Sequence, residues 1–475
     1  MNALITISVL AIVVLYLGLY NFKKALLPVT VIGLVLAALF SIAEWGKAAL
    51  PIYNGMMQYD NFAVAFSCIT IISTILIMLL SRNYFERISS NVAEYYTIIL
   101  FSLAGIIVMV SYHNLVMLFI GIEIMSVSLY ILAGIKKNYI ASNEAALKYF
   151  LMGAFSTGFL LFGITLIYGA TGSFDLEIIR SYVNFNANVW QLPAELKTVP
   201  AYSGGISPLF YVGLILMTIG LCFKIGAAPF HFWAPDVYEG SPTLITSFMS
   251  TVVKTAGFAA LLRLFIICFA AVHDFWMPVV LVIAVLTLFI GNITALYQTS
   301  FKRMLAYSSI SHVGYMLFAI IVLNQASANA IFTYTAAYSL ATIIAFGILI
   351  LVQQQTGSDS FSSFNGLSKS NPLLAFVLTI SMLSLAGIPL TAGFIGKFMM
   401  FSIALTGAHV WLVVLGVINA VIGIFYYLKV IVAMYFKDAE RNELEVPGTF
   451  KVVLVLSAIA TVLIGIFPIA LPNLF

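Results

Sequence analysis

The stretch Gly213–Arg263 decides the fold and reads GLILMTIGLCFKIGAAPFHFWAPDVYEGSPTLITSFMSTVVKTAGFAALLR. It contains two apolar helical segments, and each carries one lysine, Lys224 or Lys254, well inside the apolar run. A lysine at bilayer depth costs about 2.5–3.5 kcal/mol, so it usually faces a bundle interior or a water-filled path. Pro229 lies between the two lysines, and because proline removes a backbone N–H and clashes with the preceding turn, we expect the first helix to break close to Lys224. Non-helical backbone at that depth needs cover from protein or a wet cavity, so the stretch predicts a buried, hydrated, lysine-lined path for protons.

The composition of the whole chain is that of a polytopic membrane protein. Its 475 residues are 63% hydrophobic and 8% charged, whereas a soluble domain has about 25% charged residues. Because each span needs about 20 apolar residues, the length accommodates about fourteen spans and leaves no sizeable soluble domain. The net charge is +4 without a basic cluster, so nucleic acid is excluded as a partner and the lipid bilayer is the expected one.

The cysteines argue against a metal or iron–sulfur centre, and the N-terminus argues against a cleaved signal peptide. Cys68, Cys222 and Cys268 are isolated within apolar segments, and their spacing would not hold zinc or an iron–sulfur cluster. We therefore expect no metal and no redox centre on this chain. The segment Met1–Tyr20 is apolar without a preceding basic residue, which predicts a retained first transmembrane helix and not a cleaved signal peptide.

Apolar runs bounded by charged or Gly/Pro-rich stretches predict an all-α polytopic bundle of about fourteen transmembrane helices. The predicted spans are 3–21, 25–43, 62–81, 95–111, 114–134, 145–170, 206–235, 243–268, 276–298, 303–323, 327–353, 372–402, 409–435 and 451–471. Two hydrophilic stretches join them. Ser173–Ser207 is expected to be a surface loop with an interfacial helix, and Gln353–Asn371 to be the main linker on the opposite side.

Lysine and arginine are distributed unevenly between the predicted loops. Loops after odd-numbered spans hold twelve of them, and loops after even-numbered spans hold three. The positive-inside rule then puts the odd-numbered loops in the cytoplasm and both chain termini outside. The twelve are Lys23, Lys24, Arg82, Arg87, Lys136, Lys137, Lys302, Arg303, Lys369, Lys437, Arg441 and Lys451, and the three are Lys47, Arg180 and Lys197.

The positions of the prolines predict an internal inverted repeat. The seventh and twelfth spans are both interrupted by a proline among small residues, Pro229 or Pro389, and both carry a lysine near the break, Lys224 or Lys397. Broken helices in corresponding positions of two halves point to the ion site of a transporter, and an offset of five spans gives the halves opposite orientation. The predicted units are 1–94 with helices 1–3, 95–270 with the first repeat (helices 4–8), 271–436 with the second repeat (helices 9–13), and 437–475 with helix 14.

Five ionisable residues fall near the middle of their spans and are candidates for proton transfer. Glu123 lies about ten residues into the fifth span, which at ~1.5 Å per residue is close to the midplane. Its charge would tune the proton affinity of a neighbouring lysine. Lys224, Lys254 and Lys397 can load and release a proton when desolvated, where arginine could not, and His312 in the tenth span is a candidate relay. The structural alternatives are an ion pair for Glu123, contacts to backbone carbonyls for the lysines, and a hydrogen-bonded core position for His312.

Several other polar residues have a weaker claim to function. Glu144 and Lys148 are spaced i,i+4 at the start of the sixth span, where they either stabilise the helix end or feed protons inward. His231 follows the break at Pro229 directly and is a candidate for lining an uptake path. Lys429 and Arg263 lie toward span ends, and we expect both to snorkel to the membrane surface.

With these residues placed, the chain resembles the antiporter-like subunits of respiratory complex I, NADH:quinone oxidoreductase. The strongest motif is KIGAAPFHFWAPDVYEGSPT at 224–243, supported by FKRMLAYSSISHVGY at 301–315 and LAGIPLTAGFIGKF at 385–398. In such subunits a glutamate of the fifth span and lysines of the seventh, eighth and twelfth handle protons. The resemblance carries these roles over to Glu123, Lys224, Lys254 and Lys397.

Among these subunits the resemblance is greatest to the subunit N group, whose mitochondrial counterpart is NADH dehydrogenase subunit 2. Subunit L-type chains continue into a long lateral helix, whereas this chain ends at Phe475, and subunit M-type chains usually have glutamate at the position of Lys397. The multisubunit sodium/proton antiporters share much of the motif and are the main alternative. A purely architectural membrane protein is the third.

The resemblance also implies a setting for the chain. It would be a non-redox, proton-translocating subunit of a bacterial inner-membrane complex, with both termini on the periplasmic side. Its neighbours would be subunit M and the small K-, J- and A-type subunits. NAD(H), flavin mononucleotide, iron–sulfur clusters and quinone would be bound by other subunits, and this chain would bind none of them.

Overall fold

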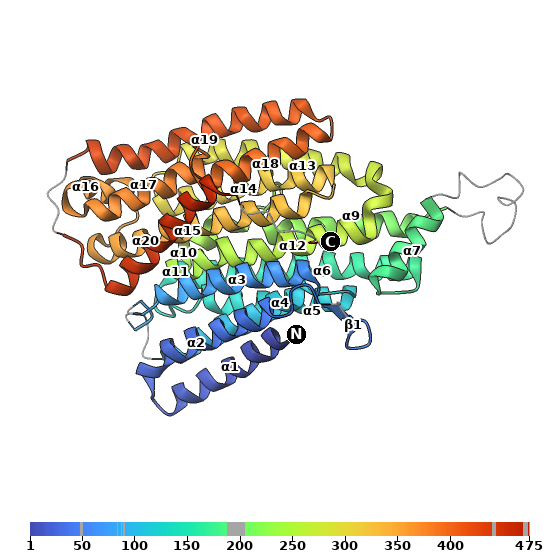
Figure 1. The fold of residues 1–475 in the computed structure, drawn as a ribbon, viewed down its shortest axis with the longest axis horizontal. Helices are drawn as coiled ribbons and strands as arrows, with labels where there is room; N and C mark the ends of the chain where they lie inside the picture. The colour runs from blue at the N-terminus through green and yellow to red at the C-terminus, as the bar shows by residue number, and fades with distance from the viewer. Residues whose placement is uncertain are drawn as a thin grey trace, which may run out of the picture.

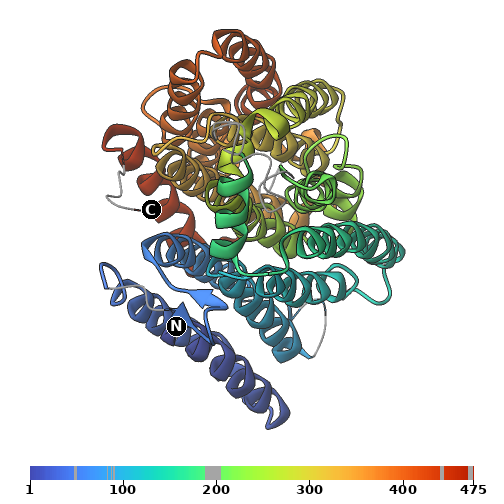
Figure 2. The same ribbon diagram turned by 90° about the vertical axis from the view of Figure 1, so that its right-hand side faces the viewer.

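The protein is a bundle of helices that run roughly along its longest axis (Figure 1). The computed structural model describes residues 1–47, 51–82, 84–86, 88, 91–187, 205–438, 443–468 and 474. The N-terminal helices α1 (Asn2–Leu19) and α2 (Lys23–Ile42) form one edge of the bundle, and α19 (Val410–Phe436) lies at the opposite edge. Seen end-on, α1 and α2 lie outside the main group of helices (Figure 2).

The elements between these edges follow the order that the apolar runs predict. In chain order they are β1 Pro51–Ile52, β2 Met57–Gln58, α3 Asn61–Leu79, α4 Val92–Val110, α5 Leu115–Ala133, α6 Ile140–Thr171, α7 Leu176–Ala187, α9 Pro208–Ile225, α10 Trp233–Gly240, α11 Thr243–Phe248, the π-helix η2 Met249–Val253, α12 Lys254–Leu264, the π-helix η3 Phe265–Phe269, the 3-10 turn η4 Ala270–Val272, α13 His273–Leu296, α14 Phe301–Val322, α15 Ser327–Thr356, the 3-10 turn η5 Phe361–Phe364, α16 Leu367–Ser370, α17 Pro372–Ala386, α18 Ala392–Thr406 and α20 Gly448–Ile466. The two short strands form an antiparallel hairpin.

The length and apolar character of these helices confirm a polytopic all-α membrane fold. Twelve helices of the described part are long and apolar enough to cross a membrane, and α17 and α18 are two shorter apolar helices that follow one another. One of the twelve, Thr243–Leu296, has 54 residues. It comprises α11, η2, α12, η3, η4 and α13 and is not one continuous α-helix; its length exceeds twice the about 20 residues that one crossing needs. The exact count of fourteen spans stays a prediction.

Two spans are broken where the prolines predict it. Helix α9 ends at Gly226 with φ 75°, and α17 ends at Gly387 with φ 83°. Glycine adopts this left-handed conformation without the Cβ clash of other residues, and the turn lets the next amides bond back to the helix end. The N–H of Ala227 donates to the carbonyl of Cys222 at 2.9 Å, and the N–H of Ile388 donates to that of Leu383 at 3.0 Å. The same local geometry therefore ends both half-helices.

Close backbone packing fixes α9 against α6. A Cβ placed on Gly163 would lie 2.7 Å from the carbonyl oxygen of Gly213, and one on Gly213 would lie 2.8 Å from that of Gly163. Small residues at such contacts let two membrane helices approach closely. The contact brings the polar groups of α6 within reach of the end of α9.

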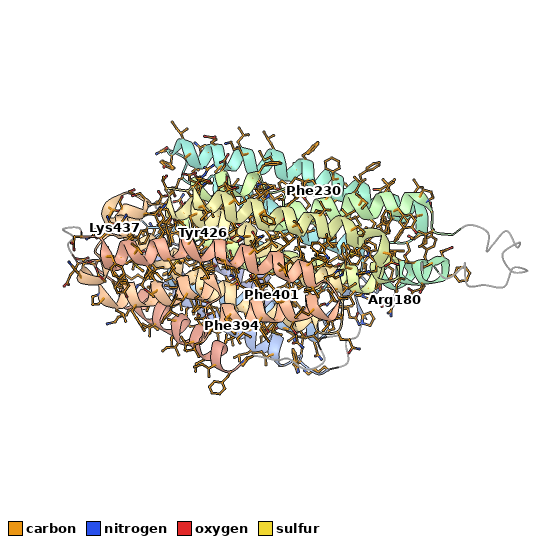
Figure 3. All side chains as sticks on the ribbon, turned by 90° about the horizontal axis from the view of Figure 1, so that it is seen from above. Arg180, Phe230, Phe394, Phe401, Tyr426 and Lys437 are labelled. Atoms are coloured by element: carbon orange, nitrogen blue, oxygen red, sulfur yellow. The ribbon has the colours of Figure 1, made fainter. Side chains whose placement is uncertain are left out.

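The ends of the bundle carry the predicted hydrophilic stretches. Helix α7 confirms a helix in the stretch Ser173–Ser207, whereas Trp190, Pro193, Glu195 and Lys197, which the sequence also assigns to that loop, lie outside the described residues, as do Arg87 and Arg441. Arg180 and Lys437 lie toward opposite ends of the long axis (Figure 3). We call the end with Lys437 the inner end, because the positive-inside rule predicts that it faces the cytoplasm.

The expectation that Arg263 snorkels is wrong. Its side chain in α12 is completely buried, and its Nη1 and Nη2 donate to Oδ2 and Oδ1 of Asp60 at 2.9 and 2.6 Å. Asp60 also caps α3, since its Oδ1 accepts from the N–H of Ala63 at 2.8 Å, and the guanidinium lies 4.9 Å from the centre of the Phe62 ring. A two-pronged bond to a carboxylate offsets the cost of burying the charge, so Arg263 has no need to reach the surface.

This pair predicts a large stability effect for a small substitution. Asp60→Asn keeps an acceptor for the α3 cap but leaves Arg263 buried without a counter-charge. We expect a loss of about 3–5 kcal/mol in the free energy of unfolding, measured as a lower melting temperature of the purified protein in mild detergent. Asp438→Asn removes the exposed partner of Lys369 and is the control, which should leave the melting temperature unchanged. A double variant Asp60→Asn/Arg263→Met that is no more stable than Asp60→Asn alone would contradict this account.

Candidate functional site

The predicted mid-span candidates lie in the interior of the bundle. The exposed fractions of Lys224, Lys254, Lys397 and His312 are 4%, 2%, 6% and 4%. Glu123 is partly buried. The three amines therefore face protein and not lipid, which the cost of exposing an ammonium group to hydrocarbon requires.

Lys224 is held by hydroxyl groups. It lies in the last turn of α9, and its Nζ donates to Oγ of Ser126 on α5 at 2.9 Å and to Oγ1 of Thr157 on α6 at 3.4 Å. The ring centre of Tyr130 is 6.0 Å from the same amine. All these neighbours are neutral, so they can accept a hydrogen bond from the charged or the uncharged amine.

Glu123 supplies a carboxylate beside this lysine. It precedes Ser126 by three residues on α5, which puts both side chains on one helix face. Lys224 donates to Ser126, so the carboxylate lies one helical turn from a hydroxyl partner of the amine. In the described part of the chain Oε1 of Glu123 is buried without a hydrogen-bond partner. Because buried polar atoms are nearly always bonded to protein or water, this oxygen has the capacity to bind a water molecule or a proton.

Lys254, the first residue of α12, lies close to the break that follows α9. A Cβ placed on Gly226 would lie 3.9 Å from Nζ of Lys254. The break itself is tied down by side chains: Nε1 of Trp233 donates to the carbonyl of Phe223 at 2.9 Å, and the N–H of Ala228 donates to Oγ1 of Thr287 at 2.9 Å. The first bond adds a donor to a carbonyl in the last turn of α9, and the second satisfies an N–H of the turn that follows the helix.

Lys254 connects the groups near the first break, Glu123 and Lys224, with those near the second break, His312 and Lys397. We call these five residues the row. Lys254 follows the π-helix η2 directly, a feature that often marks functional positions in helices. Its Nζ donates to the carbonyl of Ser309 at 3.0 Å and to Oγ of Ser309 at 2.7 Å, both on α14. Ser309 lies three residues before His312 on the same helix, so the amine ends one turn away from the histidine.

His312 is bonded on both sides of its ring. Its Nδ1 is 2.8 Å from the hydroxyl of Tyr334 on α15, and its Nε2 is 3.0 Å from the hydroxyl of Tyr427 on α19. Ser309, which accepts from Lys254, lies three residues before His312 on α14, and Tyr315, whose ring centre is 5.0 Å from Nζ of Lys397, lies three residues after it. The imidazole therefore lies between the two lysines, with a phenol at each nitrogen.

Lys397 lies at the second break. Its Nζ donates to the carbonyls of Leu385 and Ala386 at 3.0 and 2.8 Å, which belong to the last turn of α17. A cation is favourable there because the C-terminal end of a helix carries partial negative charge. A cavity of 10 Å³ separates His312 and Tyr334 from Leu385, enough for roughly one water molecule. The carbonyl contact that the sequence offers as the structural alternative for Lys397 is thus present, and one of its two acceptors, Leu385, lines a small cavity.

The weaker candidates form a separate cluster near the inner end. Nζ of Lys148 lies 2.8 Å from carboxylate oxygens of Glu144 and Asp236, and Arg303 pairs with Asp236 at 3.1 Å and contacts Glu239. Burial raises the pKa of Asp236, but the hydrogen bond and charge of Lys148 and the charge of Arg303 outweigh it and hold this pKa below its ordinary value. The cluster ties α10 to α6 and α14, and it does not join the mid-bundle row.

Two other candidates lie apart from the row. His231 is buried at the break with its ring 4.9 Å from that of Phe232, and among the described residues its Nδ1 has no hydrogen-bond partner. Lys429 is partly buried near the inner end of α19, where its Nζ is 3.4 Å from the carbonyl of Gln298 and 4.4 Å from the ring centre of Phe361.

The sequence reasoning missed the neutral partners of the charged groups. Ser126, Thr157, Ser309, Tyr334 and Tyr427 are hydroxyl residues within apolar helices, where their individual contribution is hard to recognise. A local signal exists for two of them, because Ser126 follows Glu123 by three residues and Ser309 precedes His312 by three.

No metal site is visible in the described ranges. There, no group of three or more His, Cys, Asp and Glu side chains is placed to hold a metal ion, and Cys68, Cys222 and Cys268 are free thiols.

Comparison with known proteins identifies the family. The family described as NADH:quinone oxidoreductase/Mrp antiporter, TM, matches residues 112–423. NADH-quinone oxidoreductase subunit N of Flavobacterium psychrophilum is 40% identical over 468 residues, and that of Flavobacterium johnsoniae is 41% identical over 476 residues. Each alignment covers 98% of both chains.

Solved structures agree with this assignment. A chain of respiratory complex I from Thermus thermophilus with bound aureothin is 30% identical with a TM-score of 0.79, and the alignment covers 98% of this chain and 97% of that one. A chain of the Mrp complex from a Dietzia species has a TM-score of 0.81 at 17% identity, with 98% and 94% covered, and this likeness concerns the fold alone. On the full-length identity to its relatives and the family match over most of its length, this chain belongs to the NADH-quinone oxidoreductase subunit N family.

Proposed function

We propose that this chain translocates protons across a bacterial inner membrane as a subunit of NADH-quinone oxidoreductase. The observation that carries the proposal is a row of ionisable groups that passes both helix breaks. Lys224, Lys254, His312 and Lys397 are buried and hydrogen-bonded, and Glu123 lies at the start of the row with a buried Oε1. A buried ionisable residue in a membrane bundle is expensive, and a row of them is typical of a proton relay.

The chemistry assigned to each group follows from its surroundings. A proton from the inner side reaches Lys224, passes to Lys254 and His312, and leaves toward the outer side by Lys397. Glu123 tunes the first step, because a carboxylate near the amine favours its protonated form and withdrawal of that charge releases the proton. Hydroxyl partners suit this role, since they hydrogen-bond to lysine in both protonation states.

The redox chemistry belongs to other subunits in this proposal. NAD(H), flavin mononucleotide, iron–sulfur clusters and quinone would be bound elsewhere in the complex, and this chain would act as a non-redox translocase. Subunit M and the small K-, J- and A-type subunits would be its membrane neighbours, and both termini would lie on the periplasmic side.

We also propose that the route is built on two inverted repeats, residues 95–270 and 271–436, flanked by 1–94 and 437–475. The two breaks support this division, because each follows a left-handed glycine and each has a lysine amine beside it. Half-helices that end at the midplane in two inverted halves are a recurring design of transporter ion sites.

The main alternative is a subunit of a multisubunit sodium/proton antiporter. The Mrp likeness speaks for a shared fold, whereas the relatives with about 40% identity over the full length are subunit N chains. The two functions differ in what drives transport. The antiporter reading requires sodium-dependent proton exchange in the absence of NADH, and the proposal requires NADH-driven pumping that sodium does not affect.

Replacement of Lys224 tests the proposed function directly. In vesicles that contain the whole complex, Lys224→Ala should lower the number of protons pumped per NADH oxidised, because the first relay group is lost. Lys224→Arg should do the same although it keeps the charge, since a guanidinium does not release its proton. The ratio is measured with a pH-sensitive dye alongside NADH oxidation, and the exposed substitution Lys369→Met is the control. An unchanged ratio in Lys224→Ala would refute the assignment.

Gly387 predicts a second effect, through the position of Lys397. A Cβ on Gly387 would lie 2.7 Å from Cδ of Lys397, so Gly387→Ala should displace the amine and lower the number of protons pumped per NADH. The left-handed backbone adds a strain of about 1–2 kcal/mol. Gly357→Ala is the matched control, because Gly357 has a similar φ of 69° and nothing within 4 Å of the added Cβ. Equal losses in both variants would mean that backbone strain and not the displaced lysine is responsible.

A further inference from the structure

One face of the helix that carries Lys254 bears a line of hydroxyl groups. Thr243, Ser247, Ser250 and Lys254 are separated by four, three and four residues, the spacing of a single helix face. The line begins at the first residue of α11, passes through the π-helix η2 and ends at the first residue of α12. It lies inside the bundle, since all four side chains are buried.

The end of this line at Thr243 reaches an open cavity near the inner end of the bundle. The N–H of Thr243 donates to the hydroxyl of Tyr84 at 2.8 Å, and Oγ1 of Thr243 donates to Oε1 of Gln353 at 2.7 Å. Tyr84 and Gln353 both line a cavity of 590 Å³, which Glu94 and Lys136 also line. Its volume holds many water molecules, and burial lowers the pKa of Lys136 in its wall. Thr243 is thus a buried hydroxyl residue bonded directly to two residues of the cavity wall.

The middle of the line has unused hydrogen-bonding capacity. Oγ of Ser247 is buried and, within the described ranges, has no hydrogen-bond partner, and the same is true of the hydroxyls of Ser339 and Thr342 on α15. Helix α15 packs against α11 and η2, and Oγ of Ser250 is 2.6 Å from the hydroxyl of Tyr338 on α15. Buried hydroxyls left unpartnered by protein are normally satisfied by water. The contact between these helices is therefore a polar seam.

Neighbouring hydroxyls on the same segment behave differently. Thr251 donates to the carbonyl of Ser247 at 2.7 Å, and Thr255 donates to that of Thr251 at 2.9 Å. These hydroxyls are bonded to the backbone of their own helix. The face with Thr243, Ser247 and Ser250 instead directs its hydroxyls toward other helices or leaves them without a protein partner.

The other end of the line is Lys254, which belongs to the row of ionisable residues. Lys254 lies four residues beyond Ser250, and the ring centre of Tyr238 is 5.8 Å from its Nζ. The hydroxyl of Tyr238 is also buried and unpartnered in the described structure. Lys254 in turn donates to Ser309, one turn from His312. Buried hydroxyl groups are therefore spaced along one helix face between a residue bonded to the cavity wall, Thr243, and the lysine at the centre of the row.

We propose that Thr243, Ser247 and Ser250, with Tyr338, form a proton-uptake route from the inner cavity to Lys254, separate from the one that passes Lys224. The inference rests on the proposed function of proton translocation. Each hydroxyl or intervening water accepts a proton on its oxygen from the cavity side and releases its own hydrogen toward Lys254. One proton advances, only O–H bonds form and break, and the amine of Lys254 takes up the proton at the end. The hydroxyl residues are positioning residues that order this chain.

Ser247→Ala tests the route with little risk to folding, because Oγ of Ser247 makes no hydrogen bond to the described protein. A structural role predicts no loss in this variant. The route predicts that the initial rate of NADH-driven proton uptake and the number of protons pumped per NADH fall toward the values of Lys254→Ala, with an unchanged melting temperature. Thr251→Val, which removes a buried hydroxyl from the same segment, is the matched control and should pump like the unmodified complex.

A second set of variants separates the effect of losing the hydroxyl group from the effect of changing the side chain's size. Ser250→Ala should lower pumping in the complex, and Ser250→Thr, which keeps a hydroxyl, should restore it. Normal pumping in both Ser247→Ala and Ser250→Ala, with a loss in Lys254→Ala, would overturn the route and leave the proposed function intact. Normal pumping in Lys254→Ala would instead count against the proposed function. A loss in Thr251→Val as large as that in Ser247→Ala would also overturn the route, because the effect would then be structural.

Discussion

Two helices end in the middle of the bundle, and the backbone carbonyls freed at those ends must be satisfied where bulk water is absent. Glycines in the left-handed conformation, Gly226 and Gly387, allow the chain to turn there. At the first break the indole of Trp233 bonds to the carbonyl of Phe223, and at the second the ammonium of Lys397 bonds to two carbonyls of α17. In lipid each unsatisfied group would cost several kcal/mol, so the breaks dictate which polar groups the bundle must bury. At the second break the group that satisfies the backbone, Lys397, is also one that the proposed proton route uses.

Buried cations in the described part of this protein differ in their partners, which are a carboxylate, hydroxyl groups or, as for Lys397, backbone carbonyls. Arg263 is fixed by both oxygens of Asp60, an arrangement in which neither partner has reason to change its charge. Lys224 and Lys254 instead donate to Ser126, Thr157 and Ser309, whose hydroxyls are neutral. A buried charge without a fixed counter-charge is easily neutralised by loss of a proton, whereas a paired one is not. The contrast supports a static role for the arginine and proton transfer for the lysines.

The inner charged cluster gives the first break a mechanical connection to the rest of the bundle. The half-helix α10 carries Asp236 and Glu239, which pair with Lys148 on α6 and Arg303 on α14. Helix α14 also carries Ser309 and His312, so one helix contacts both the cluster and the centre of the row. A change of charge or hydration at the cluster would therefore act on the half-helix next to Lys224.

The sequence alone determined the properties that depend on a single residue and its immediate neighbours in the chain. A membrane bundle, two broken spans and the burial of Lys224, Lys254 and Lys397 can all be predicted, because lipid penalises charge and proline interrupts a helix wherever they occur. Only the tertiary structure decided the partners. Arg263 is buried because Asp60, 203 positions away, caps a neighbouring helix, and Lys254 lies near His312 because α12 and α14 meet at Ser309. The price of burying a charge depends on the residue itself, but the group that compensates it depends on which helices come into contact.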